Sequence, residues 1–194
     1  AIAGDGPSTV QRRLAGTCHV LAHTSIQDAL VERLANPLSG WTAGDLFDET
    51  TTVAPQRDGA EAERLAYYVD DAVTKGATLV RGGAADGRQF EPTLLSDVPA
   101  NAALLHDDQP TPVVPVTPFE SEGDALAAVG AGGPSQSVDV FTDRHSLGMD
   151  VADAVQAGTV NIRGGGAGAT DGLRGGDTAA AIRQLTRTKR VRTG

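Results

Sequence analysis

One side chain of this sequence is a strong nucleophile when ionised, the thiol of Cys18. It is the only cysteine among 194 residues, so it cannot form a disulfide within the chain. Such a thiol is either a small buried hydrophobe or a reactive group. As a thiolate it can attack a carbonyl carbon and form a covalent intermediate. The residues around Cys18 leave both roles open.

Carboxylate and imidazole side chains form two further candidate sites. Asp107 and Asp108 stand side by side before a proline-rich segment, where they are either a binding contact or a solvated acidic turn. His19 and His23 flank an apolar stretch beside Cys18. No second ligand pair at zinc spacing accompanies these histidines. We therefore predict no metal site.

The helix that follows Cys18 has the clearest boundaries in the sequence. Thr24 and Gln27 match a capping box, and an apolar face at four-residue spacing begins with Ile26. Pro37 is expected to end the helix.

Helices and strands alternate along the rest of the chain. Apolar periodicity predicts further helices at about 58–75, 121–129 and 143–155, with short strands at 78–80, 93–95, 113–116, 138–141 and 159–162. Pro115 favours an edge or bulged position for the strand that contains it. The alternation predicts an α/β fold with a twisted, mostly parallel sheet that carries helices on both faces.

Glycine enrichment marks a boundary near the end of the chain. Residues 163–176 are too glycine-rich for regular structure. We predict one domain over residues 1–162, followed by a glycine-rich loop and a C-terminal helix and arm over residues 163–194. The basic end, 186–192, is expected to be an exposed strand or a tail.

Composition limits the classes of partner. The net charge of −9 disfavours binding to nucleic acid and to anionic membranes. No apolar run reaches the roughly 20 residues that span a bilayer, and no secretory leader pattern opens the sequence. A single cysteine also argues against a disulfide-stapled secreted protein. We expect a cytoplasmic protein.

A series of motifs in fixed order resembles the catalytic half of the aldehyde dehydrogenase superfamily. After Cys18 come Gly76-Ala77 with Gly82-Gly83, Phe90 to Val98, Asp107-Asp108, Asp139 to Asp143, and Gln156 to Ile162. The closing segment, 186–191, is similar to the non-phosphorylating glyceraldehyde-3-phosphate dehydrogenase branch. The resemblance covers the chain from about Cys18 to its end.

The resemblance implies oxidation of a small aldehyde to a carboxylic acid with NAD or NADP. Cys18 matches the nucleophile, which in the family forms a thiohemiacetal and then a thioester. Asp108 matches the carboxylate that contacts the nicotinamide ribose. Ile2 falls where the family has its general-base glutamate, and no segment here matches the family's dinucleotide-binding domain. We therefore expect these residues alone not to bind the cofactor and to be close to inactive.

Two alternatives stay open at this point. One is a non-catalytic module that pairs with a full-length dehydrogenase subunit or with a second copy of itself. The other is a cofactor-independent thiol esterase that acts through an acyl group on Cys18.

Overall fold

The computed structural model of the chain describes residues 19–45, 47–106, 112–131, 135–163 and 190–193. The chain divides into two compact units, Ala1–Glu122 and Gly123–Gly194. Each unit is considered by itself. The expected boundary after residue 162 stays a prediction, because residues 164–189 lie outside the described part.

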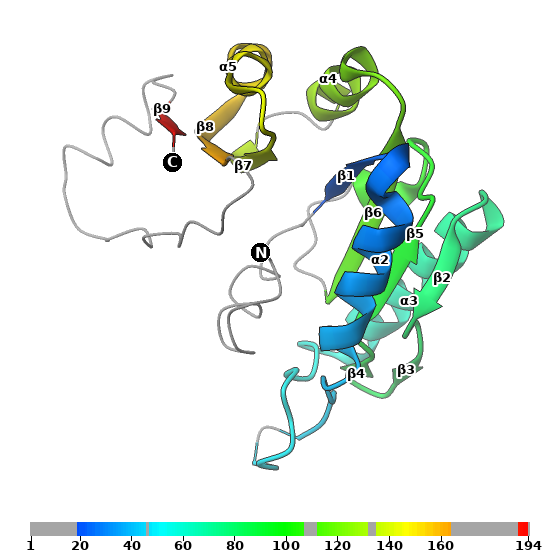
Figure 1. Cartoon of the computed structure of the whole chain (residues 1–194). Helices are drawn as coiled ribbons and strands as arrows, with labels where there is room; N and C mark the ends of the chain where they lie inside the picture. Colours follow the sequence, from blue (N-terminus) through cyan, green and yellow to red (C-terminus); the bar gives the residue numbers. More distant parts are fainter. Residues whose placement is uncertain (1–18, 46, 107–111, 132–134, 164–189, 194) are drawn as a thin grey trace. The chain divides into compact units, whose positions relative to one another are not determined.

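A four-stranded sheet in the order β1-β6-β5-β2 forms the centre of the first unit (Figure 1). Strands β1, β6 and β5 run parallel, whereas β2 is antiparallel to β5. A two-stranded antiparallel ladder, β3-β4, accompanies it. The strands are β1 Val20–His23, β2 Thr78–Arg81, β3 Ala85–Asp86, β4 Gln89–Phe90, β5 Thr93–Ser96 and β6 Val113–Phe119, and a short 3₁₀ helix, η1 Ala103–Leu105, lies between β5 and β6.

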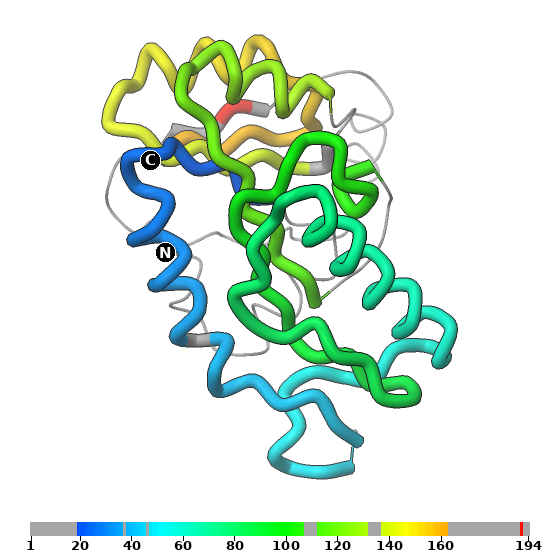
Figure 2. Tube along the Cα trace, turned by 90° about the vertical axis from the view of Figure 1, so that its right-hand side faces the viewer, coloured from blue at the N-terminus to red at the C-terminus, as the bar shows by residue number. Residues whose placement is uncertain are grey.

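Two helices cover opposite faces of this sheet. They are α2 (Thr24–Leu38) and α3 (Gly59–Thr74), which Figure 2 shows on either side of the green strands. Successive strand residues point to opposite faces. Leu94 therefore belongs to the apolar cluster on α2, and Leu95 to the cluster on α3. Both leucines are fully buried, as in a parallel sheet covered on both faces.

The second unit contains a parallel sheet in the order β7-β8-β9. Helix α5 packs on it at Gly148, where an added Cβ would lie 2.5 Å from Ile162 Cγ2. The glycine therefore lets the helix approach β8 closely. The helices and strands of the second unit are α4 Glu122–Ala131, β7 Ser135–Phe141, α5 His145–Ala154, β8 Ala157–Arg163 and β9 Arg190–Thr193. Together the two sheets confirm the predicted α/β class with mainly parallel strands.

Of the two positions predicted for the strand around Pro115, edge or bulged, the edge is wrong. Strand β6 is central, with β1 on one side and β5 on the other. Its two neighbours use different halves, since β5 pairs with residues 113–115 and β1 with residues 116–119. Pro115, which has no N–H to donate, stands where one pairing ends and the other begins.

Helix α2 differs from its prediction at both ends. Pro37 does not end it, because the helix runs to Leu38. Near its start, Ile26 is 57% exposed and Gln27 is 6% exposed, so the buried face is rotated from the expected one. The side chain of Gln27 donates to Asp97, 70 positions away. A tertiary contact therefore sets the orientation of the first turn.

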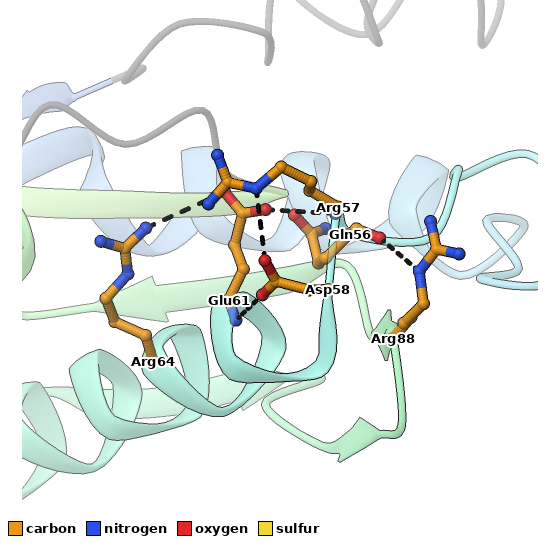
Figure 3. Close-up of polar contacts among 6 residues, drawn as sticks. All are labelled: Gln56, Arg57, Asp58, Glu61, Arg64 and Arg88. Atoms are coloured by element: carbon orange, nitrogen blue, oxygen red, sulfur yellow. Dashed lines mark hydrogen bonds and ion pairs between the residues drawn. The ribbon is translucent and has the colours of Figure 1, made fainter.

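The predicted α3 helix is confirmed, and its first turn is capped by side chains (Figure 3). Asp58 Oδ1 accepts from the Glu61 N–H at 2.9 Å, and Glu61 Oε2 accepts from the Arg57 N–H at 3.1 Å. The preceding loop is held by two bonds between Gln56 and Arg88. The Asp58 carboxylate satisfies one of the backbone N–H groups that a helix start leaves unpaired. The other contacts hold the residues that lead into the helix.

The end of α3 is joined to η1 through Asp71. Its Oδ2 accepts from the Ala103 N–H at 2.8 Å and from Lys75 Nζ at 2.9 Å. Lys75 Nζ also donates to the Asn101 carbonyl at 2.8 Å. The Ala103 hydrogen bond, followed by the Lys75 contact, lowers the pKa of Asp71 from its ordinary 3.8.

Asp71→Asn is expected to lower stability near neutral pH and to lose this effect in acid. A carboxylate whose pKa is lowered by folding adds stability above its unfolded pKa, and the contribution disappears as pH falls through the folded pKa. The difference in urea midpoint should therefore be largest above about pH 5 and small below about pH 3. Asp70→Asn, on the exposed side of the same helix, is the control. Identical pH profiles for the two variants would contradict the assignment.

Candidate functional site

The predicted site residues fall just outside the described part of the chain. Cys18, Asp107 and Asp108 are not among the described residues, so their roles stay predictions. Their immediate neighbours, His19 and His106, are described. The geometry of the site is therefore built from the elements that adjoin these positions.

The two candidate segments lead into neighbouring parallel strands. Cys18 directly precedes His19, after which β1 begins at Val20, and Asp108 precedes β6, which begins at Val113. Strands β1 and β6 pair in parallel, with Val20 opposite Val116. Parallel neighbours enter a sheet at the same edge. Both segments thus lead into the amino-terminal edge of this sheet.

The ring of His19 makes a contact across to β6. Its Nε2 lies 2.8 Å from Thr117 Oγ1, a hydroxyl group on a residue that is 8% exposed. Part of His19 faces solvent, yet burial of the ring and, second, the charge of His106 lower its pKa to about 4. The ring is therefore neutral at pH 7. The effect of His106 means that the two histidines lie within electrostatic reach.

Two other histidines, His23 and His106, have structural partners. The ring of His23 meets Phe119 edge-on at 5.4 Å between centroids, and its Nδ1 lies 2.8 Å from Ser25 Oγ. His106 Nε2 donates to the Ala100 carbonyl at 2.9 Å. Within the described ranges, no three ligand side chains gather at a spacing that could hold a metal ion.

The motifs at Gly82-Gly83 and Phe90–Val98 meet in space and serve the fold. The Gly83 N–H donates to Thr93 Oγ1 at 2.8 Å, and that hydroxyl donates to the Glu91 carbonyl at 2.7 Å. Gly82 has φ +78°, and a Cβ there would collide with the Pro92 carbonyl oxygen. These contacts give both motifs a structural role in the fold, and a catalytic role is not needed to account for them.

Sequence reasoning missed a polar cluster where β5 ends. Gln27 Nε2 donates to Asp97 Oδ1 at 2.6 Å, and Ser96 Oγ donates to Asp97 Oδ2 at 3.0 Å. Asp97 has φ +55°, which is uncommon for a residue with a side chain. The buried Gln27 Oε1 finds no hydrogen-bond partner among the described residues. No local signal predicts this cluster, because its members come from distant parts of the chain.

The turn between β1 and α2 does not fit a dinucleotide. A pyrophosphate site of the Rossmann type needs a glycine-rich turn between a strand and the helix after it. Here β1 ends at His23 and α2 begins at Thr24, with no glycine between them. The cofactor contact expected at Asp108 lies outside the described residues.

None of the helices in the described ranges has the length and apolarity that crossing a bilayer requires.

Comparison with known proteins places this arrangement in a family. Residues 14–182 match the model of the aldehyde dehydrogenase family. Glutarate-semialdehyde dehydrogenase of Pseudomonas putida is 30% identical over 147 residues, which are 75% of this chain and 31% of that protein. Mitochondrial succinate-semialdehyde dehydrogenase of Rattus norvegicus is 31% identical over 149 residues, or 75% of this chain and 28% of that protein.

Solved structures share the fold. The NADP complex of NADP-dependent glyceraldehyde-3-phosphate dehydrogenase from Bacillus halodurans gives a TM-score of 0.72 at 24% identity, over 83% of this chain and 33% of that one. The NADP complex of glyceraldehyde-3-phosphate dehydrogenase from Methanocaldococcus jannaschii gives 0.68 at 26% identity, over 74% and 31%. The chain spans about a third of the length of its curated relatives. The family model, the relatives and the fold agree, and the chain belongs to the aldehyde dehydrogenase family.

Proposed function

We propose that the protein takes part in the oxidation of an aldehyde to a carboxylic acid, with Cys18 as the nucleophile. Family membership supports the reaction class, and relatives named as semialdehyde dehydrogenases support a small aldehyde as substrate. The observation that supports the site most is the parallel pairing of β1 with β6, the strands that follow Cys18 and Asp108 in the chain. The described neighbours of these two segments are His19 and His106. One directly follows Cys18 and the other directly precedes Asp107.

The chemistry proposed for this chain is the addition of a thiol to an aldehyde. The thiolate Sγ of Cys18 forms a bond to the carbonyl carbon while the carbonyl π electron pair moves onto oxygen, and that oxygen takes up a proton from water to give a thiohemiacetal. His19 is neutral at pH 7 because burial and His106 lower its pKa to about 4. It therefore supplies no positive charge to lower the pKa of the adjacent thiol. This disfavours a thiol esterase that relies on a permanent Cys–His ion pair.

The experiment for the nucleophile measures how an aldehyde protects Cys18 from alkylation. Because the chain has a single cysteine, iodoacetamide labelling read by mass reports Cys18 alone. We expect succinate semialdehyde to slow the labelling of the folded chain much more than the labelling of the urea-unfolded chain. Propionate, which has no aldehyde carbon, is the control and should not slow it. Equal protection in both states would reject Cys18 as a folded-state nucleophile.

We further propose that these 194 residues alone do not hold NAD or NADP. The β1–α2 turn offers no dinucleotide cradle, and the chain spans about a third of its curated relatives. A nicotinamide supplies the hydride acceptor in this kind of oxidation, so turnover by this chain alone should be very low.

Titration calorimetry with NAD and with NADP is expected to show no saturable binding up to about 1 mM, a level at which even a binding free energy of about −4 kcal/mol would be visible. Saturable binding at micromolar cofactor would contradict the proposal. In that case Asp108→Ala should weaken the binding, whereas Asp86→Ala, at an exposed position in β3, should not.

A further inference from the structure

We propose that Asp86–Gly87 is a site of spontaneous covalent modification, at which aspartate converts to isoaspartate, and that Asp58–Gly59 is protected from the same reaction. The Asp-Gly dipeptide occurs at 5–6, 58–59, 86–87 and 171–172, and the pairs at 58–59 and 86–87 lie in the described part of the chain. The proposal is independent of the function proposed above. It rests on the different structural settings of two chemically identical pairs.

The reaction needs only the two residues and water. The peptide nitrogen of Gly87 forms a bond to Cγ of the protonated Asp86 carboxyl group, the Cγ–OH bond breaks, and the hydroxyl leaves with the amide proton as water. The product is a five-membered succinimide, and water then adds to one of its two carbonyl carbons. Addition at the main-chain carbonyl breaks that C–N bond and leaves the chain running through Cγ, which is isoaspartate. Addition at Cγ restores aspartate.

The setting of Asp86 allows this ring to close. In the β3–β4 hairpin Asp86 lies opposite Gln89, so Gly87 and Arg88 form a two-residue turn. Both residues of β3 are exposed, and among the described residues the Asp86 carboxylate has no hydrogen-bond or ion-pair partner. A Cβ added at Gly87 would have nothing within 4 Å. The carboxyl group can therefore swing against the Gly87 nitrogen, which has no side chain beside it to block the approach.

Asp58 is exposed as well, but its carboxyl group is already engaged (Figure 3). Oδ1 accepts from the Glu61 N–H at 2.9 Å, and Oδ2 accepts from Arg57 Nε at 3.3 Å. Gly59 is the first residue of α3, so helical backbone fixes its nitrogen. The Glu61 hydrogen bond, followed by the Arg57 contact, also lowers the pKa of Asp58 from its ordinary 3.8. Less of this carboxyl group is therefore in the protonated form that closes the ring.

The modified turn adjoins the start of α3. A Cβ added at Gly59 would lie 3.3 Å from the Gly87 carbonyl oxygen. The Gln56 N–H donates to the Arg88 carbonyl at 2.7 Å, and Arg88 Nε donates to the Gln56 carbonyl at 3.0 Å (Figure 3). Isoaspartate adds a methylene to the main chain just before Gly87, so the turn must shift against these contacts. We expect the modification to lower the stability of the first unit.

The test incubates the native chain and the guanidinium-unfolded chain in mildly acidic buffer and follows both sites by peptide mapping. Trypsin cuts after arginine, which places the two pairs in separate peptides, 58–64 and 82–88. Isoaspartate gives a second chromatographic peak of unchanged mass, and a protein isoaspartyl methyltransferase with labelled S-adenosylmethionine identifies it.

In the native chain we expect Asp86 to convert at least about tenfold faster than Asp58. Asp58 must first give up its N-cap hydrogen bond and its contact with Arg57, which together account for about that factor. In guanidinium the two sites should convert at similar rates, because the dipeptides are identical. Equal conversion at the two sites of the native chain, or slower conversion at Asp86, would overturn the proposal. An equally large difference in the unfolded chain would also overturn it, since the fold would then not be the cause.

The effect on stability is read from the urea midpoint of Trp41 fluorescence before and after incubation. Asp86→Glu is the control, because its longer side chain cannot form the five-membered ring. The midpoint of the parent chain should fall as isoaspartate accumulates in peptide 82–88, and the midpoint of Asp86→Glu should stay in place. An equal fall in both chains would place the loss at another residue and reject the link between the turn and α3.

Discussion

Gly82→Ala is expected to lower the free energy of unfolding of the first unit by about 2–4 kcal/mol. The residue has φ +78°, where a side chain is strained, and the new Cβ would collide with the Pro92 carbonyl oxygen and approach Thr93 Oγ1. Backbone on both sides must shift to relieve the collision. That shift also disturbs the Gly83–Thr93 hydrogen bond.

Trp41 allows this effect to be measured by urea unfolding. It is the only tryptophan of the chain, and it packs against the apolar cluster between α2 and the sheet. Gly87→Ala is the matched control, since Gly87 has φ +58° but nothing within 4 Å of an added Cβ. The control should cost only about 1 kcal/mol, the penalty of the left-handed conformation. Equal losses in the two variants would show that the Pro92 contact has no role.

Phe90→Ala is expected to destabilise the first unit by about 3–5 kcal/mol. Phe90 is 1% exposed and belongs to the cluster that α3 forms on the sheet. Removing its ring takes away buried apolar contacts and leaves a cavity in the cluster that also contains Leu65 and Leu95.

Phe141→Ala is the control for the loss of an aromatic ring. Phe141 is 55% exposed on β7, so its removal should change stability by no more than about 0.5 kcal/mol. The Trp41 transition should move to lower urea in Phe90→Ala and stay in place in Phe141→Ala. A shift of less than about 1 kcal/mol in Phe90→Ala would mean that the core readily collapses into the space.

Local sequence patterns predicted most element types correctly. Helix α3 lies between Asp58 and Lys75 as expected, and Thr93–Ser96 and Ala157–Arg163 are strands near their predicted positions. Such patterns work because a helix or strand repeats its buried face at a fixed spacing. They failed at α2, where Ile26 was expected to be buried, and at β6 they left open an edge position that the sheet order excludes.

The candidate site was likewise predictable from the sequence only in part. The order of the motifs predicted the aldehyde dehydrogenase family, which the comparisons confirm. The roles of Cys18 and Asp108 remain predictions. The parallel pairing of the strands that follow them, and the contacts of His19 and His106, were not predictable from the motifs.

The sequence by itself determined the alternation of helices and strands, the family and the identity of the single thiol, because periodicity and short motifs are local. Only the tertiary structure decided the strand order β1-β6-β5-β2, the central place of β6, and the partners of Gln27 and His19. The physical reason is sequence distance. Gln27 meets Asp97 across 70 positions and His19 meets Thr117 across 98, and such contacts depend on how whole elements pack rather than on any local pattern.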